Sequence, residues 1–308
     1  MKAKHLTIFI IGTCVLALAY FLFLAPRPAV APTISGIQVS TSFYPLYFFA
    51  SAIGGEKVSV HNITPPGAEP HDYTPTPNDI KMIERSGVLV LNGDGLEAWG
   101  DAVTTNINPA KTAVVVAGEG LATRTMLEGG QEIVDPHVWL SPPLAKEMTT
   151  KILTALVVAD PKNGDYYREN AALLNTKLDQ LDHDYRTGLA DCARKDFVTA
   201  HAAFGYLAAT YDLTQVPIAG LSPDAEPSPK QLAAIITFIR AKGINVIFFE
   251  SLVSPKLAQT IAAETRAQTL ILDPLEGLSE NDLRDGKDYL SVMRENLKNL
   301  QIALSCKV

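Results

Sequence analysis

Apolar residues along this chain recur in two alternating patterns, short continuous or every-other-residue runs and longer stretches at helical spacing. The short runs predict strands, and the stretches with a period near 3.6 residues predict helices. In the first half of the chain, strands are expected at residues 36–41, 58–64, 88–91 and 113–117, and helices at 44–53, 78–85, 96–105 and 143–158. Residues 118–134 have no strong period and contain Gly129-Gly130, which predicts a loop. Strands that alternate with helices are typical of an α/β layer with a mostly parallel sheet.

A second series of the same kind follows. Strands are expected at residues 196–200, 245–250 and 269–274, an apolar segment lies at 215–218, and helices are expected at 202–211, 230–241, 255–267 and 285–304. Between the two series, residues 165–189 contain no proline and no glycine before Gly188. A helix of that length spans roughly 37 Å, which is too long for a crossover within one compact sheet. The pattern predicts lobes at 36–160 and 193–308 joined by one long rigid helix within 161–192, and a single domain with a long surface helix is the alternative.

The N-terminus has the pattern of a targeting segment. Two lysines precede an apolar run over residues 6–24, and Ala29-Val30-Ala31 offers a small-residue cleavage site. The run is close to membrane-spanning length, and Pro32 disfavours cleavage. Residues 1–31 are therefore expected to be a signal peptide or an N-terminal membrane anchor. In both cases the body is exported, to the periplasm or the extracytoplasmic cell surface.

Export changes how the cysteines are interpreted. Removal of the leader leaves Cys192 and Cys306. Two cysteines in an oxidising compartment predict one disulfide, which would tie the end of the last helix to the segment before residue 196. Two free buried thiols are the alternative.

Composition and charge narrow the function classes. The chain has 308 residues, of which 47% are hydrophobic and 19% charged, and this balance is typical of a globular protein with a substantial core. Its net charge of −7 gives no support to nucleic-acid binding. An acidic body is compatible with collecting a cation.

One histidine lies in an unusually stiff stretch. Residues 65–77 hold five prolines and a glycine around His71. Proline fixes φ and removes a backbone donor, so the stretch is expected to be a loop that presents its histidine at a defined place. A polar turn with an exposed histidine is the plainer interpretation, because metal ligands come in groups.

Four other polar residues share a topological position with this histidine. His201, Glu250 and Asp273 end predicted strands, and His137 follows a loop after a strand. Ligands of open α/β sheets bind outside the strand ends, so two facing lobes would bring the set together. Three imidazoles and a carboxylate suit a divalent transition metal, whereas magnesium or calcium would need oxygen ligands. Taken alone, Glu250 could be a helix cap and Asp273 a turn residue.

Several motifs also resemble one protein family. They are PPGAEPHDY at 65–73, TPNDI at 76–80, DPHVWLSP at 135–142, TAHAAFGYL at 199–207 and LDPL at 272–275. Together they resemble the metal-binding solute-binding proteins of bacterial zinc and manganese ABC importers, of the zinc type. The similarity covers essentially the whole mature chain.

The resemblance implies two similar α/β lobes joined by one long rigid helix, with the metal in the interlobe cleft. It implies His71, His137 and His201 as metal ligands and Asp273 as the fourth. It also implies delivery of the metal by a monomer to an ABC permease and its ATPase. Histidine rather than glutamate at the third position favours zinc over manganese. Many zinc-type members carry a His- and Asp-rich loop before the second ligand, but residues 118–134 contain no histidine.

Other functions remain as alternatives. They are a manganese-specific protein of the same type, a surface metal-binding adhesin and a secreted metallohydrolase. The hydrolase would need an open coordination position for water and a general base, and the chain has no H-E-x-x-H motif. We therefore expect a binding protein and no enzyme.

Overall fold

The computed structural model describes residues 36–307 apart from residues 94 and 226, so the expected leader at 1–31 lies outside the described residues. The described residues pack as one unit that contains two four-stranded sheets. None of the helices in this described part is both long and apolar enough to cross a membrane.

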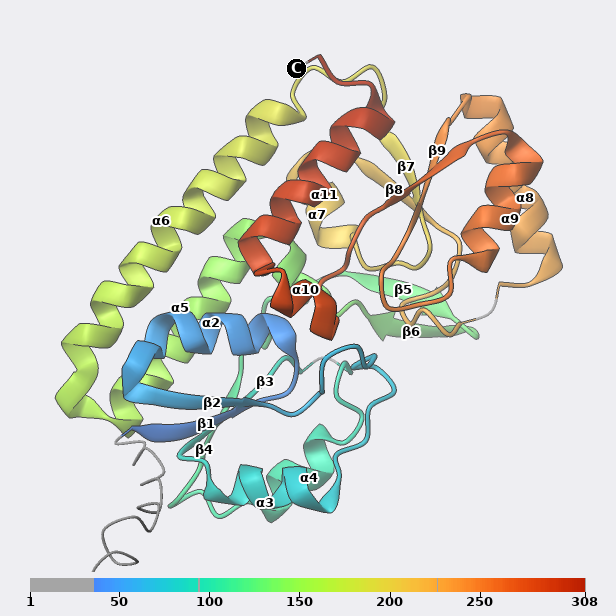
Figure 1. Ribbon diagram of the computed structural model, residues 1–308. Coiled ribbons are helices and arrows are strands. Elements are labelled where there is room, and N and C mark those ends of the chain that lie inside the picture. Colours follow the sequence, from blue (N-terminus) through green and yellow to red (C-terminus); the bar gives the residue numbers. More distant parts are fainter. Residues whose placement is uncertain (1–35, 94, 226, 308) are drawn as a thin grey trace, which may run out of the picture. The chain divides into compact units, whose positions relative to one another are not determined.

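The N-terminal lobe is built on a parallel sheet with the spatial order β2-β1-β3-β4. Its strands are β1 (Ile37–Thr41), β2 (Val58–Asn62), β3 (Val88–Leu91) and β4 (Ala113–Val116). Alternate side chains of β3 enter two different clusters, because successive residues of a strand point to opposite faces. Val88 and Val90 pack with α2 (Tyr44–Gly54) and α5 (Pro142–Ala159), and Leu89 and Leu91 pack with α3 (Pro77–Arg85) and α4 (Gly100–Asn106). Helices therefore cover both faces of this sheet, as Figure 1 shows.

The C-terminal lobe repeats this arrangement. Its strands are β7 (Asp196–Thr199), β8 (Thr214–Pro217), β9 (Val246–Phe249) and β10 (Gln268–Ile271), all parallel, in the order β10-β9-β7-β8. Its helices are α7 (Gly205–Thr210), α8 (Pro229–Lys242), α9 (Lys256–Thr265), α10 (Glu280–Arg284) and α11 (Tyr289–Leu304). In both sheets the first strand in sequence lies between the second and the third. The two lobes are thus similar α/β layers, which confirms the predicted fold class.

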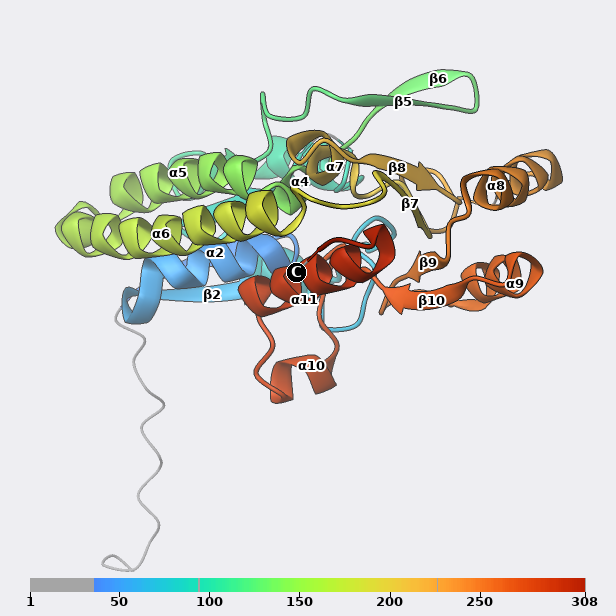
Figure 2. The same cartoon turned by 90° about the horizontal axis from the view of Figure 1, so that it is seen from above.

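A single helix, α6 (Gly164–Gly188), connects the lobes. It contacts α5 and α2 of the N-terminal lobe and α11 of the C-terminal lobe. Its buried face includes Tyr167, Leu174, Leu178 and Tyr185, which recur at helical spacing. Figures 1 and 2 show α6 alongside α5 over much of its length. The predicted long connector is confirmed to within one residue at each end.

The prediction of a loop over residues 118–134 was wrong for the second half of this segment. This segment contains an antiparallel hairpin of β5 (Thr125–Glu128) and β6 (Gln131–Val134). Gly129 and Gly130 form its turn with φ values of +58° and +84°, which favour glycine and are typical of a two-residue hairpin turn. Most side chains of both strands are exposed or only partly buried, so no alternation of apolar residues revealed them.

The helix predicted at 96–105 is shorter than expected. It begins at Gly100, because the preceding residues form a turn held by Glu97. The carboxylate of Glu97 accepts hydrogen bonds from the backbone N–H groups of Asn92 and Gly93, at 2.7 and 2.9 Å. A side-chain contact of this kind leaves no trace in the hydrophobic pattern.

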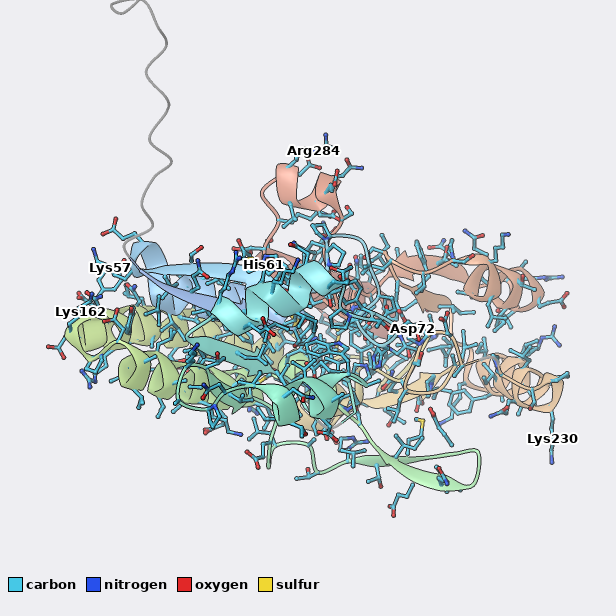
Figure 3. The ribbon with its side chains drawn as sticks, turned by 90° about the horizontal axis from the view of Figure 1, so that it is seen from below. Lys57, His61, Asp72, Lys162, Lys230 and Arg284 are labelled. Carbon is cyan, nitrogen blue, oxygen red and sulfur yellow. A yellow bond between two sulfur atoms is a disulfide. The ribbon has the colours of Figure 1, made fainter. Side chains whose placement is uncertain are left out.

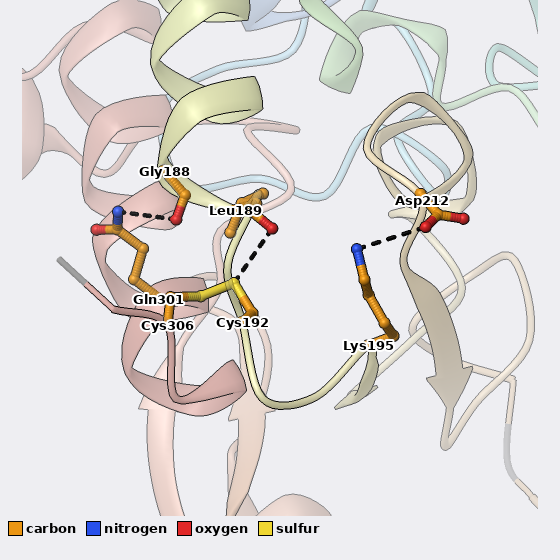
Figure 4. Close-up of a disulfide and its surroundings, with 7 residues drawn as sticks. All are labelled: Gly188, Leu189, Cys192, Lys195, Asp212, Gln301 and Cys306. Carbon is orange, nitrogen blue, oxygen red and sulfur yellow. Dashed lines mark hydrogen bonds and ion pairs between the residues drawn. A yellow bond between two sulfur atoms is a disulfide. The ribbon is translucent and has the colours of Figure 1, made fainter.

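The predicted disulfide between Cys192 and Cys306 is present. It joins residues 114 positions apart in sequence. Figure 4 shows it below the end of α6, where Gln301 of α11 also donates a hydrogen bond to the carbonyl of Gly188 at 3.2 Å. A covalent bond and a hydrogen bond therefore link the C-terminal ends of α6 and α11.

Replacing both cysteines by serine is expected to lower the free energy of unfolding by about 2–5 kcal/mol, because the unfolded chain would lose a long covalent loop. Urea denaturation of the exported body, compared with the wild type, measures this change. A thiol assay under denaturing conditions is the control, and it should detect free cysteines only after reduction. Reactive thiols in the unreduced wild type would contradict the pairing.

Candidate metal centre

Four buried or half-buried side chains converge where the two lobes meet. His71, His137, His201 and Glu276 each offer one ligand atom, and these atoms all lie within 4.8 Å of one another. His137, His201 and Glu276 are almost completely buried, and the side chain of His71 is 10% exposed. The group is thus shielded from water, with His71 as its most accessible member.

Each lobe supplies two of the four. In the N-terminal lobe, His71 lies in the proline-rich loop after β2, and His137 follows the β5–β6 hairpin. In the C-terminal lobe, His201 follows β7, and Glu276 follows β10. Strand β7 continues to β8 on one side, whereas the neighbouring β9 continues to β10 on the other, so the connections diverge between β7 and β9. Ligands of open α/β sheets bind at such a switch point.

The spacing of the four groups fits a tetrahedral ion. The Oε1 atom of Glu276 lies 3.4 Å from Nε2 of His71, 3.1 Å from Nε2 of His137 and 3.2 Å from Nε2 of His201. The Nε2 atoms of His71 and His137 are 3.3 Å apart. Zinc bonds of about 2.0–2.1 Å in a tetrahedron would separate the ligand atoms by about 3.3–3.4 Å. Small outward shifts would therefore admit an ion.

Two carboxylates orient two of the imidazoles from behind. Nδ1 of His137 lies 2.8 Å from Oδ1 of Asp135, and Nδ1 of His201 lies 2.7 Å from Oε1 of Glu250. A proton on each Nδ1, donated to the carboxylate, leaves Nε2 free as a ligand atom on the side facing the group. Glu250, which was expected at a strand end, thus lies behind His201. It is not one of the four clustered residues.

Asp135, Glu250 and Glu276 change the pKa values of the imidazoles they contact. Burial disfavours the charged form of His201, but Glu250 and Glu276 outweigh this effect and raise the His201 pKa well above its usual value. For His137, burial is likewise outweighed by Asp135 and Glu276, and the pKa is raised. Burial alone would raise the pKa of Glu276, but the neighbouring imidazoles hold it well below its usual range. The carboxylate of Glu276 is therefore ionised at neutral pH.

A second glutamate lies close to this group. Burial and the charge of Glu276 raise the pKa of Glu69 to about 9. Its Oε1 accepts a hydrogen bond from the backbone N–H of His71 at 3.2 Å, and its Oε2 has no partner among the described residues. In the metal-free protein, burial and the charge of Glu276 therefore favour the neutral form of Glu69.

Asp273, the carboxylate expected as the fourth ligand, does not join the three imidazoles. One of its oxygens accepts a hydrogen bond from the hydroxyl of Ser251, and the other accepts one from the backbone N–H of Leu275 at 2.7 Å. Burial raises the pKa of Asp273 to about 6, although these two hydrogen bonds act in the opposite direction. Glu276, three residues later, occupies the expected place.

Glu276 was not predicted from the sequence, because it does not end a strand. Glu276 lies in the turn that follows β10, and the preceding Leu275 has a left-handed φ of +57°. Nothing in the apolar pattern signals such a bend. A usable signal was the position of an acidic residue between Leu275 and Gly277, directly after the LDPL motif.

An acidic pair lies beside the group. Asp72, which follows His71, is labelled between Lys57 and Lys230 in Figure 3. A hydrogen bond with Asp224 of the C-terminal lobe raises the pKa of Asp72. The pair thus brings one acid from each lobe together directly after His71, and the raised pKa disfavours the ionised form of Asp72.

A protein-family model described as "Zinc-uptake complex component A periplasmic" (ZnuA) matches residues 39–303. The chain belongs to this family. The match covers both sheets, apart from the first two residues of β1, and all four clustered residues. It confirms the resemblance drawn from the motifs.

Individual family members support the assignment. The chain is 37% identical over 321 residues to the "High-affinity zinc uptake system protein ZnuA" of Bacillus subtilis (strain 168), with 100% of both chains covered. It is also 37% identical over 286 residues to the "Zinc-binding protein AdcA" of Streptococcus pyogenes serotype M1. That match covers 86% of this chain and 56% of AdcA, so the chain spans about half the length of that relative.

Solved structures of family members share the fold. The Zn(II)-bound ZnuA-like domain of Streptococcus pneumoniae AdcA is 36% identical, with a TM-score of 0.76 over 87% of this chain and 99% of that one. The laminin-binding protein Lmb of Streptococcus agalactiae, described as bifunctional with adhesin and metal-transporting activity, is 36% identical with a TM-score of 0.79. That match covers 87% of this chain and 99% of Lmb.

Proposed function

We propose that this protein is an extracytoplasmic solute-binding protein that captures zinc and delivers it to an ABC permease for import. The observation that carries the proposal is the buried group of His71, His137, His201 and Glu276, whose ligand atoms lie within 4.8 Å of one another. In this proposal zinc is the transported cargo, and each lobe contributes two of its ligands.

The donor set favours zinc over manganese. Imidazole suits zinc, whereas carboxylate, carbonyl and water oxygens suit manganese. Three of the four donors are imidazoles, and Asp135 and Glu250 support two of them by hydrogen bonds at 2.8 and 2.7 Å. A manganese-specific protein of the same type would be expected to present more oxygen donors.

The proposed ligand set also argues for transport and against catalysis. Catalytic zinc sites keep one coordination position for water or substrate, whereas sites with four protein ligands are closed. With Glu276 as the fourth ligand in place of Asp273, this site would be closed. We therefore do not propose a hydrolase.

The proposed partners are the permease and its ATPase, and the proposed working form is a monomer. All four ligand residues come from one chain, so no second copy is needed to complete the site. The proposed lobes span residues 36–160 and 193–308, with the connector at 161–192. The proposed leader at 1–31 is a signal peptide or an anchor that would leave the protein attached to the membrane.

A competition titration tests this function. Apo protein is mixed with zinc and a chromophoric chelator, and the metal content is measured in parallel by elemental analysis. We expect one zinc per chain and a lower affinity for manganese. A protein that retains no zinc against a weak chelator, or that prefers manganese, would contradict the proposal.

Zinc affinity is expected to fall as the pH falls. In the metal-free protein the pKa values of His137 and His201 are raised, so protons compete with zinc at a higher pH than they would at an ordinary imidazole. Because more than one proton is displaced, the affinity should already be falling by more than about tenfold per pH unit at about pH 6.5, the ordinary imidazole pKa. Titrations between about pH 8 and pH 5.5 measure this slope, and an affinity independent of pH would contradict coordination by these imidazoles.

Adhesion remains a second candidate, because the Lmb structure of the same fold is described as that of a laminin-binding adhesin. Binding of the purified protein to immobilised laminin, with and without zinc, distinguishes the two activities. Zinc binding without laminin binding would leave transport as the function.

A further inference from the structure

The turn that carries Glu276, residues 273–278, is held by hydrogen bonds at its start, middle and end. At its start, the side chain of Asn296 on α11 accepts a hydrogen bond from the N–H of Asp273 at 2.9 Å and donates one to its carbonyl at 2.7 Å. In its middle, the indole N–H of Trp139 donates to the carbonyl of Pro274 at 2.8 Å. At its end, the N–H of Gly67 donates to the carbonyl of Leu278 at 3.0 Å. The hydrogen bonds from Trp139 and Gly67 come from the N-terminal lobe.

The carboxylate of Asp273 fixes the bend within this turn. Its Oδ1 accepts the backbone N–H of Leu275 at 2.7 Å. Leu275 is completely buried and has a φ of +57°, a conformation that costs free energy for a residue other than glycine. A local hydrogen bond from an aspartate two residues earlier can hold such a bend. The next residue in the chain is Glu276, so this bend sets where its carboxylate lies.

The other oxygen of Asp273 connects the turn to a second part of the site. It accepts a hydrogen bond from the hydroxyl of Ser251, the residue after Glu250. Glu250 in turn accepts hydrogen bonds from both the backbone N–H and Nδ1 of His201, at 3.1 and 2.7 Å. Asp273 therefore lies between the segment that carries Glu276 and the segment that orients His201.

We infer that Asp273 is a positioning residue for zinc binding, which places the Glu276 carboxylate and links it through Ser251 to the Glu250–His201 pair. This inference rests on the proposed function. The sequence predicted that Asp273 coordinates the metal directly. The inference gives it the different role of placing a ligand. Because Asp273 is not among the four residues whose ligand atoms lie together, its contribution depends on its hydrogen bonds to Ser251 and Leu275 and not on a bond to the ion.

Two substitutions of Asp273 separate positioning from coordination. Asp273→Ala removes both hydrogen bonds and is expected to weaken zinc binding by about 10–100-fold, the usual cost of losing a partner behind a metal ligand. Asp273→Asn keeps an oxygen for the N–H of Leu275 and offers an amide N–H to the Ser251 hydroxyl, so most of the affinity should return. Asp285→Ala is the matched control, because it removes an exposed acid from the same region.

A spectroscopic readout excludes a merely structural effect. Co²⁺ in a four-coordinate tetrahedral site absorbs visible light far more strongly than Co²⁺ in a six-coordinate site. We expect Asp273→Ala to reduce this absorption, because Glu276 is displaced, and Asp273→Asn to restore it. Ser251→Ala should weaken zinc binding as well, and the double variant with Asp273→Ala should bind no more weakly than Asp273→Ala alone, because both changes remove the same hydrogen bond.

The outcomes are distinguishable. Wild-type zinc affinity and an unchanged Co²⁺ spectrum in Asp273→Ala would overturn the inference while leaving the proposed function intact. A loss in Asp273→Asn as large as that in Asp273→Ala would overturn it in favour of direct coordination. A wild-type protein that binds neither ion would overturn the proposed function and this inference together.

Discussion

Replacement of Glu276 by alanine is expected to weaken zinc binding by more than about 100-fold, because even the loss of a partner behind a ligand costs 10–100-fold. Glu276 contributes the only carboxylate oxygen of the four-residue group, and it lies 3.1–3.4 Å from all three Nε2 atoms. Its removal would take away one donor and the negative charge that offsets the charge of the ion. Competition with a chromophoric chelator measures the change.

Glu280→Ala is the matched control for this experiment. Glu280 is an exposed glutamate four residues later in the chain, on α10, and it is outside the group. Its replacement should leave zinc affinity unchanged. If Glu276→Ala bound zinc as tightly as the control, the carboxylate would not be a ligand, and the closed site proposed above would be wrong.

Replacement of His201 by glutamate is expected to shift the preference from zinc toward manganese by about tenfold or more. A carboxylate suits manganese better than an imidazole does. The new side chain would also face Glu250, which now bonds Nδ1 of His201 at 2.7 Å, so repulsion should weaken the binding of both ions. The informative quantity is therefore the ratio of the two affinities, measured by competition titration.

The control for this substitution is His61→Glu. His61 is 38% exposed, it lies outside the group of four, and its Nε2 is 3.8 Å from Asp79. The same change of residue type at this position should leave the ratio of zinc to manganese affinity unaltered. An unchanged ratio in His201→Glu as well would show that His201 is not a ligand.

The architecture was predictable because it depends on the apolar pattern. Continuous apolar runs such as residues 88–91 predicted buried parallel strands, and the long stretch without proline predicted the connector α6. The β5–β6 hairpin escaped prediction because it depends on two glycines with positive φ and has few buried side chains. The shortened α4 escaped prediction because the Glu97 carboxylate accepts backbone hydrogen bonds that hold the preceding turn.

The site was predictable only in part. His137 and His201 follow regular elements in recognisable motifs, and the prolines around His71 indicated a stiff loop. The structure brings these three histidines together with Glu276 and not with Asp273. The choice between the two carboxylates depends on the bend at Leu275, which follows from a hydrogen bond and not from any periodicity of the sequence.

X-ray absorption at the zinc K-edge of wild-type protein loaded with one equivalent of zinc tests the central claim most directly. The account predicts four light-atom ligands at about 2.0–2.1 Å, with the outer-sphere scattering of three imidazoles and the remaining ligand an oxygen. The same measurement on Glu276→Ala should show that oxygen lost or replaced by water. Six oxygen-rich ligands, or fewer than three imidazoles in the wild type, would contradict a zinc site built from His71, His137, His201 and Glu276.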